Sequence, residues 1–253
     1  MKHYEKLVEL GCFSRGELAD LLGSDATAAS MIQSYIRKGY IERVRHDLYA
    51  VISLESKQPI PSRYQIGTHL FPDACVSHHS AFEFYGYANQ VFYETYVTTK
   101  SRLSNFTYDG IHYRRVFPRC EAYVIQTGGV RITSIERTVI DSINDFEKIG
   151  GLEETLRCIL LIPTLDCERL LEVLACHGSG YLYQKCGFLL EQINSSFGIS
   201  QQFFDECRTH ISGSKKYLMK GGIQQNWQEK WNLYAPDSIQ SLIDKGVTAY
   251  DTI

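Results

Sequence analysis

The sequence predicts an α+β protein that begins with a winged helix-turn-helix and continues into a larger α+β domain. Residues 14–51 show two short helical patterns and then two alternating strand patterns, residues 73–133 hold several β-branched and aromatic segments, and residues 151–212 are nearly all helical. We therefore expect two domains, residues 1–54 and residues 61–253, joined by a linker with two prolines. The second domain is expected to combine a small antiparallel sheet with a helical C-terminal half.

The winged helix-turn-helix is predicted from its start and stop signals. Ser14 is followed three residues later by Glu17, which is the spacing of a capping box, and Gly23 ends that helix. A second helix follows and ends at Gly39. Two segments with period-two alternation, YIERV and DLYAVI, then flank a tight turn at residues 45–47. Helix, short turn, helix and hairpin is the order of a winged helix-turn-helix.

The second helix of this pair carries a polar stripe opposite its apolar face. Ser30, Gln33, Ser34 and Arg37 recur at i, i+3, i+4 and i+7, so they share one side of the helix. Serine and glutamine can hydrogen-bond base edges or phosphates, and arginine can bind guanine with two hydrogen bonds. The residues that we expect to contact DNA are Thr27, Ser30, Gln33, Ser34, Arg37 and Lys38 in the helix, and Arg43, Arg45 and His46 in the wing.

Other interpretations of the charged residues stay open. The stripe can also be a solvated helix face, and helix-turn-helix shapes also serve as protein-binding modules. The net charge of −3 argues against a broadly basic coat, but residues 100–137 carry seven lysines and arginines against three acids. A locally positive face can bind phosphate even on an acidic protein. The candidates for such a second face are Lys100, Arg102, Arg114, Arg115 and Arg119.

The second domain is expected to begin with mixed structure and to become helical after residue 151. Strands are predicted at residues 73–77, 91–99, 111–117, 122–127 and 130–133, and helices at residues 78–87, 135–146, 152–162, 166–178, 181–193 and 200–211. A short strand at 215–222, an extended segment at 223–236 and a last helix at 238–246 follow.

Signatures of catalysis are missing from the sequence, which has no Walker loop, GxSxG, GxGxxG, HExxH or paired Asp-x-Asp. His78 and His79 point about 100° apart on a helix, so we expect one inside and one at the surface or in a hydrogen bond, instead of a metal pair. Glu136, Arg137 and Asp141 favour a structural ion pair over acid–base catalysis. We expect no enzymatic activity, no cofactor, no metal and no catalytic residue.

The eight cysteines and the hydropathy indicate a cytoplasmic protein. The closest cysteines are nine residues apart and none has CxxC spacing, so buried, reduced thiols are expected. No apolar run approaches the ~20 residues that span a bilayer. The first residues also lack the pattern of a signal peptide. We therefore expect no membrane partner.

Three segments carry a resemblance to a known family. RVRHDLYAV, VSHHSAFEFYG and ITSIERTVIDSI, in this order, resemble the AbiEi antitoxins of bacterial abortive-infection systems, which are similar to transcriptional regulators of phage-defence loci. The resemblance implies a winged helix that binds double-stranded operator DNA and represses its own operon. It also implies a C-terminal antitoxin domain and a nucleotidyltransferase-like toxin that is neutralised without a stable complex, as in type IV systems.

One position departs from the family pattern. The wing turn of these antitoxins usually has the sequence Arg-Gly-Leu-Tyr, and here Asp47 replaces the glycine. Aspartate tolerates a left-handed backbone better than most residues, so we expect the hairpin to form. Two further hypotheses stay open: a nucleic-acid-processing enzyme that uses the central basic face, and a protein-interaction module that binds the toxin through the winged helix.

Overall fold

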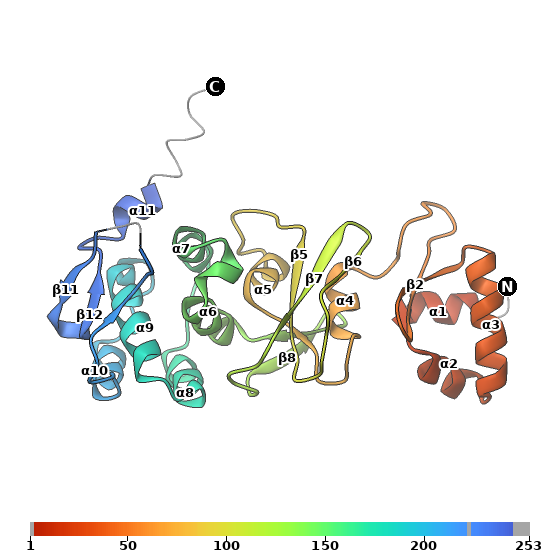
Figure 1. Ribbon diagram of the computed structural model, residues 1–253, viewed down its shortest axis with the longest axis horizontal. Coiled ribbons are helices and arrows are strands. Elements are labelled where there is room, and N and C mark those ends of the chain that lie inside the picture. Colours follow the sequence, from red (N-terminus) through yellow and green to blue (C-terminus); the bar gives the residue numbers. More distant parts are fainter. Residues whose placement is uncertain (1–2, 222–223, 245–253) are drawn as a thin grey trace, which may run out of the picture. The chain divides into compact units, whose positions relative to one another are not determined.

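The computed structural model describes residues 3–221 and 224–244. The chain is an α+β protein, as the sequence predicts (Figure 1). It divides into two compact units. The described residues of Met1–Val76, Tyr93–Phe117 and Gln126–Ile132 form the first unit, and those of Ser77–Phe92, Pro118–Ile125 and Thr133–Ile253 form the second. Among the described residues, no helix is long and apolar enough to cross a membrane.

The first unit begins with three helices and a small sheet whose strand order is β1-β3-β2. The Ser14 hydroxyl accepts a hydrogen bond from the Glu17 backbone N–H, and the Glu17 carboxylate accepts one from the Ser14 N–H, so the predicted capping box is confirmed. The elements are α1 (Tyr4–Leu10), β1 (Cys12–Phe13), α2 (Arg15–Leu22), α3 (Asp25–Arg37), β2 (Ile41–Arg45) and β3 (Leu48–Val51). Leu7, Phe13 and Leu18 are fully buried at their centre.

The central sheet has six strands and is mixed, so the prediction of an antiparallel sheet is wrong. Its strand order is β6-β7-β5-β4-β9-β8, and the pairs β4–β9 and β5–β7 are parallel. Alternating residues identify a strand but do not say which strand it pairs with, and parallel pairs need long crossover connections. Before and within this sheet the chain forms α4 (Arg63–Thr68), β4 (Cys75–Val76), β5 (Glu94–Thr98), β6 (Phe106–Tyr108), β7 (Ile111–Val116), β8 (Val124–Thr127) and β9 (Val130–Thr133).

Strand β6 lies in a segment that the sequence analysis leaves as a loop. It pairs antiparallel with β7 through a two-residue turn at Asp109 and Gly110. Both turn residues have positive φ angles, 49° and 74°, as a tight hairpin of this type requires. The loop between the predicted strands 91–99 and 111–117 is therefore shorter than expected, because the Asp-Gly turn closes a hairpin there.

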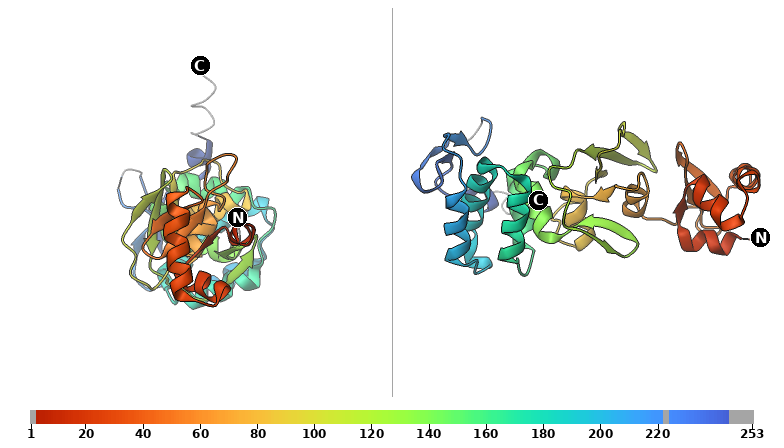
Figure 2. Two further views of the ribbon diagram at one scale, coloured as in Figure 1. Left: turned by 90° about the vertical axis from the view of Figure 1, so that its right-hand side faces the viewer. Right: turned by 90° about the horizontal axis from the view of Figure 1, so that it is seen from below.

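The second unit is mostly helical, and the four helices predicted between residues 152 and 211 are confirmed. Helices α8, α9 and α10 lie side by side in two views (Figure 1, Figure 2). The elements are α5 (His78–Tyr85), α6 (Ile135–Asn144), η1 (Phe146–Ile149), α7 (Leu152–Leu160), α8 (Cys167–His177), α9 (Gly180–Gln192), η2 (Asn194–Ser196), α10 (Gln201–Thr209), β10 (Lys216–Tyr217), β11 (Asn226–Gln228), η3 (Glu229–Trp231), β12 (Leu233–Ala235) and α11 (Gln240–Asp244).

The C-terminal strands form a third sheet, with the order β10-β12-β11. The predicted strand at residues 215–222, extended segment at 223–236 and helix at 238–246 correspond to β10, to β11 and β12, and to α11. Parts of these predictions, residues 222–223 and 245–246, lie outside the described residues.

A close approach between α9 and Trp231 shapes the core of the second unit. The indole of Trp231 is 2% exposed and its Nε1–H donates a hydrogen bond to Glu191 Oε2 at 2.9 Å. A Cβ atom on Gly187 would lie 2.0 Å from the Trp231 ring. A side chain at position 187 would therefore clash with the Trp231 ring, and only glycine fits there.

We expect Gly187→Ala to lower the free energy of unfolding by about 1–3 kcal/mol, because the indole must leave its packed position. This loss is expected even though alanine has a higher helix propensity than glycine in a helix interior. Urea denaturation of the variant and the parent measures it. Gly213→Ala is the control, since a Cβ atom there meets nothing within 4 Å. Equal stability of the Gly187 variant and the parent would show that the ring is not held against the helix.

Candidate functional site

Helix α3 exposes the polar stripe that its sequence periodicity indicates. Ala28, Ile32 and Tyr35 form its buried face. The side chain of Arg37 stays near its own helix, where Nε donates to the Gln33 carbonyl at 3.4 Å. The residues predicted to contact DNA are exposed at Thr27, Ser30, Gln33, Arg37 and Lys38, and half-buried at Ser34. One helix side thus presents hydroxyl, amide and cationic groups together.

The three predicted wing residues have different surroundings. Arg43 and His46 are exposed, and Arg43 Nη2 donates to the Tyr49 hydroxyl at 3.2 Å. Arg45 is half-buried, and its guanidinium carbon lies 5.2 Å from the Phe71 ring centroid and 5.7 Å from that of Phe106. Its Nη1 is buried without a hydrogen-bond partner. Arg45 thus packs on aromatic rings of its own unit, and we do not keep it among the residues proposed to contact phosphate.

Asp47, which stands where the AbiEi antitoxins that the sequence resembles usually have glycine, joins two elements of the first unit. Its φ angle is 56°, in the left-handed region that glycine and aspartate tolerate best. Its Oδ1 accepts a hydrogen bond from the backbone N–H of Arg15 at 3.0 Å. A carboxylate at a helix N-terminus is favourable because the first backbone N–H groups lack helical partners. Asp47 therefore joins the hairpin turn to the start of α2.

Two of the five central basic residues, Arg114 and Arg115, are engaged within the protein. Arg114 donates to Glu94 Oε1 at 2.7 and 2.9 Å, and Arg115 donates to the carbonyls of Thr99 and Lys100 at 3.3 and 2.8 Å. The side chains of Arg102 and Lys100 are exposed. Arg119 is also exposed, but it belongs to the second unit, whereas the other four belong to the first.

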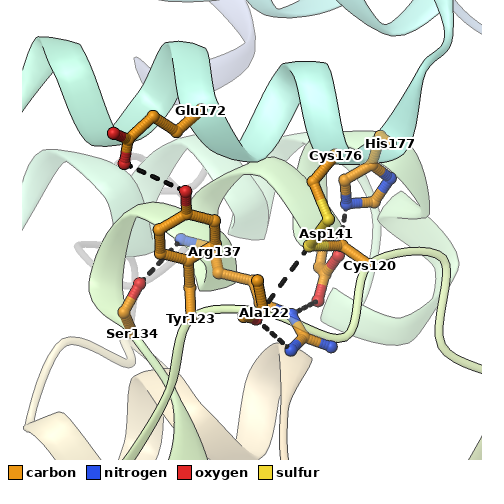
Figure 3. Close-up of a disulfide and its surroundings, with 9 residues drawn as sticks. All are labelled: Cys120, Ala122, Tyr123, Ser134, Arg137, Asp141, Glu172, Cys176 and His177. Carbon is orange, nitrogen blue, oxygen red and sulfur yellow. Dashed lines mark hydrogen bonds and ion pairs between the residues drawn. A yellow bond between two sulfur atoms is a disulfide. The ribbon is translucent and has the colours of Figure 1, made fainter.

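A buried polar network centres on α6 in the second unit (Figure 3). Arg137 is 1% exposed, and it donates through Nε to Asp141 Oδ2 at 3.2 Å and through Nη1 to the Ala122 carbonyl at 2.6 Å. Asp141 Oδ1 lies 2.8 Å from His177 Nε2. Burial alone would raise the pKa of Asp141, but the His177 hydrogen bond and nearby positive charge outweigh it and lower that pKa. The predicted Arg137–Asp141 ion pair is therefore present, and Glu136 beside it is also buried.

A disulfide between Cys120 and Cys176 adjoins this network (Figure 3). The expectation that all eight cysteines are reduced thiols is wrong for this pair. The two residues are 56 apart in sequence, so no spacing motif marks them. Cys120 lies in the loop before β8 and Cys176 lies on α8, and their Cα atoms are 5.5 Å apart. The other six cysteines lie within the described residues and are thiols, as expected.

Both histidines at the start of α5 are buried, and His78 makes a hydrogen bond, which is one of the two expected arrangements. Residues on all sides of this helix turn are buried, which leaves no solvent-facing position there. His78 has a φ angle of 55°, and its Nδ1 lies 2.9 Å from the Ser77 hydroxyl. Burial lowers the pKa of His78 from its ordinary 6.5 to about 4, although Asp141 acts in the opposite direction. His79 is 0% exposed and stacks on Phe92 at a centroid distance of 3.8 Å.

Lys185 is a buried cation that no sequence motif indicates. It borders a hollow of about 850 Å³ in the second unit. Its ammonium group donates to the carbonyls of Ile143 and Asn144, at 2.8 and 2.9 Å, and so binds the last turn of α6. Burial lowers the pKa of Lys185 to about 8. Its position inside a mostly apolar helix gives no sign of this role in the sequence.

Of the comparisons with known proteins, only the one with solved structures gives a match, and it bears on the fold. The sequence matches no protein-family model. It also matches no curated protein. Among solved structures, the chain is similar to the crystal structure of the RV2827C protein from Mycobacterium tuberculosis, with a TM-score of 0.61 and 13% identity over 93% of this chain and 89% of that chain. At this identity the similarity shows a shared fold over most of both chains.

We expect loss of the disulfide to destabilise the second unit. Cys176→Ser should lower the free energy of unfolding by about 2–4 kcal/mol under non-reducing conditions, because the bond restricts the unfolded chain. Urea denaturation with and without dithiothreitol measures this effect. Cys167→Ser, a half-buried thiol on the same helix, is the matched control. A parent protein whose stability does not respond to dithiothreitol would contradict the expectation.

The buried state of His78 predicts a loss of stability in mild acid. Between pH 6.5 and about 4, the unfolded chain binds a proton at His78 that the folded chain does not bind. This contribution to stability is complete above pH 6.5 and is lost as the pH falls toward 4, by about 3 kcal/mol in total. Denaturation at a series of pH values measures it.

The variant His78→Asn should remove this part of the pH dependence, because asparagine does not titrate there and tolerates a positive φ angle. His210→Asn is the control, since that histidine is exposed. If the His78 variant loses as much stability in mild acid as the parent, another group is responsible.

Proposed function

We propose that this protein is a DNA-binding transcriptional autorepressor and the antitoxin of a type IV, AbiE-like toxin–antitoxin operon for phage defence. The DNA-binding part of the proposal is carried by one observation, the exposed polar stripe of α3 together with the exposed Arg43 of the adjoining hairpin. The antitoxin part rests on the three segments that resemble the AbiEi family. An autorepressor acts on the chromosome, so the proposal includes a cytoplasmic location.

The proposal treats residues 1–54 as a winged helix-turn-helix. The order of elements supports it, since α1, β1, α2, α3 and the β2–β3 hairpin follow one another as they do in winged helices. Strand β1 pairs with β3, and β3 with β2, so the hairpin is anchored to the helices by a three-stranded sheet. In such domains the second helix of the pair enters the major groove and the first crosses the backbone.

The charge of this segment limits the affinity that we expect. Residues 1–54 carry seven lysines and arginines and seven acids, so attraction to DNA must come from a local group of cations. Arg37, Lys38 and Arg43 are exposed and suit phosphate contacts, and Ser30 and Gln33 suit base edges. About three phosphate contacts for each bound chain correspond to a slope of roughly −3 in a plot of log affinity against log salt.

The toxin partner in this proposal is a nucleotidyltransferase-like enzyme that is not held in a stable complex. The alternative of a nucleic-acid-processing enzyme draws no support from Arg114 and Arg115, because their guanidinium groups are engaged by Glu94 and by backbone carbonyls. We therefore retain the repressor as the conclusion.

We expect Arg37→Ala to weaken binding to the DNA upstream of the gene by about fivefold to tenfold and to reduce the salt slope by about one. Gln33→Ala should lower affinity for this DNA more than affinity for unrelated DNA of equal length, because a base contact is lost. Fluorescence anisotropy titrations at several salt concentrations measure both effects.

Arg208→Ala is the control for charge, because Arg208 lies on α10 of the second unit and pairs with Asp205. It should bind DNA as the parent does. No binding of the parent to its own upstream DNA at low salt, or equal losses for the Arg37 and Arg208 variants, would show that α3 is not a DNA-reading helix.

A further inference from the structure

Two helices of the second unit bring a histidine, a glutamate and a cysteine together in the protein interior. His79 and Glu83 are four residues apart on α5, and Glu154 and Cys158 are four residues apart on α7, so each pair shares one helix face. His79 and Cys158 are 0% exposed and Glu154 is 3% exposed. Donor atoms of His79, Glu154 and Cys158 all lie within 4.8 Å of one another.

The ring of His79 is unusual because neither nitrogen has a hydrogen-bond partner although the ring is fully buried. Nδ1 lies 3.7 Å from Glu83 Oε1, and Nε2 lies 3.7 Å from Glu154 Oε1. Both distances exceed those of an N–H···O hydrogen bond. Buried polar atoms without partners carry a free-energy cost and are rare in native proteins. His79 is therefore the member of the cluster that lacks hydrogen-bond partners, whereas the Cys158 thiol donates a hydrogen bond to Glu154 Oε1.

The two carboxylates are held in place by other donors. Glu83 Oε1 accepts a hydrogen bond from the Phe92 backbone N–H at 2.8 Å. Glu154 accepts from the Gln90 backbone N–H at 3.1 Å and from Asn89 Nδ2 at 3.3 Å. These bonds fix the carboxylates on either side of the imidazole ring.

We propose that His79 Nε2, a carboxylate oxygen of Glu154 and the Cys158 sulfur bind a zinc ion. In a tetrahedral zinc site with bonds of 2.0–2.3 Å, the donor atoms are roughly 3.5 Å apart. Glu154 Oε1 lies 3.7 Å from His79 Nε2 and 3.5 Å from Cys158 Sγ, so two of the three separations already suit such a site. A water molecule can fill the fourth position.

The donor set favours zinc over other common ions. Magnesium and calcium prefer oxygen donors alone, whereas thiolate and imidazole together suit zinc. Glu83 has the place of an outer carboxylate that accepts the Nδ1–H of a zinc-bound histidine and fixes the ring orientation. The stacked Phe92 ring covers one face of the imidazole. The ion would join α5 to α7 in a site closed to solvent.

The test uses the full chain, purified after removal of its affinity tag, because a histidine tag binds zinc itself. Mass spectrometry of the metals should find roughly one zinc ion per chain. Cobalt added to the metal-depleted protein should give the absorption band of a thiolate–cobalt bond, which requires no variant. Cys158→Ala should remove the band and most of the zinc.

Cys186→Ala is the matched control, because Cys186 is a fully buried thiol outside the cluster, and it should keep the metal. Glu83→Gln should weaken zinc affinity by about 10- to 100-fold through loss of the outer carboxylate. A protein without zinc and without a cobalt–thiolate band would have only a buried histidine–carboxylate cluster here, which overturns the proposal. Zinc that is retained in full by the Cys158 variant overturns it as well.

Discussion

The guanidinium of Arg137 is the constraint around which the second unit is arranged, because a charge that is 1% exposed must be compensated by fixed partners. Its own helix supplies Asp141, and the segment before β8 supplies the Ala122 carbonyl. Asp141 in turn binds His177 at the end of α8. The disulfide adjoins the same contacts, since Cys176 precedes His177 and Cys120 lies two residues before Ala122. One buried cation thereby joins two helices and a loop.

Most elements of the fold could be predicted because their signals are local. The capping box at Ser14, the serine cap of α6 at Ser134 and the helical periodicity of α7 to α10 are all contained within a few residues. The direction of strand pairing could not be predicted. Strand β4 pairs with β5 on one side and with β9 on the other, and nothing within its two residues specifies either partner. Pairing is decided by packing of the whole chain.

In the candidate sites, too, local features could be predicted from the sequence and contacts between distant segments could not. The exposed stripe of α3 is a property of one helix, so spacing alone predicts it. The surroundings of Arg45 depend on Phe71 and Phe106, which lie far from it along the chain. A count of local charges does not reveal these contacts. His79 and Cys158 likewise come from different helices, with no motif that joins them. Contacts between distant segments therefore account for what sequence reasoning missed.

The place of β4 in the central sheet has a consequence for synthesis on the ribosome. Strand β9, its parallel partner, is made more than fifty residues later, so one edge of β4 stays open in the nascent chain until then. Pairings between distant segments form slowly, and open strand edges attract other chains. The N-terminal helices can form from local contacts as soon as they emerge. A chaperone would thus be most useful while the central sheet forms.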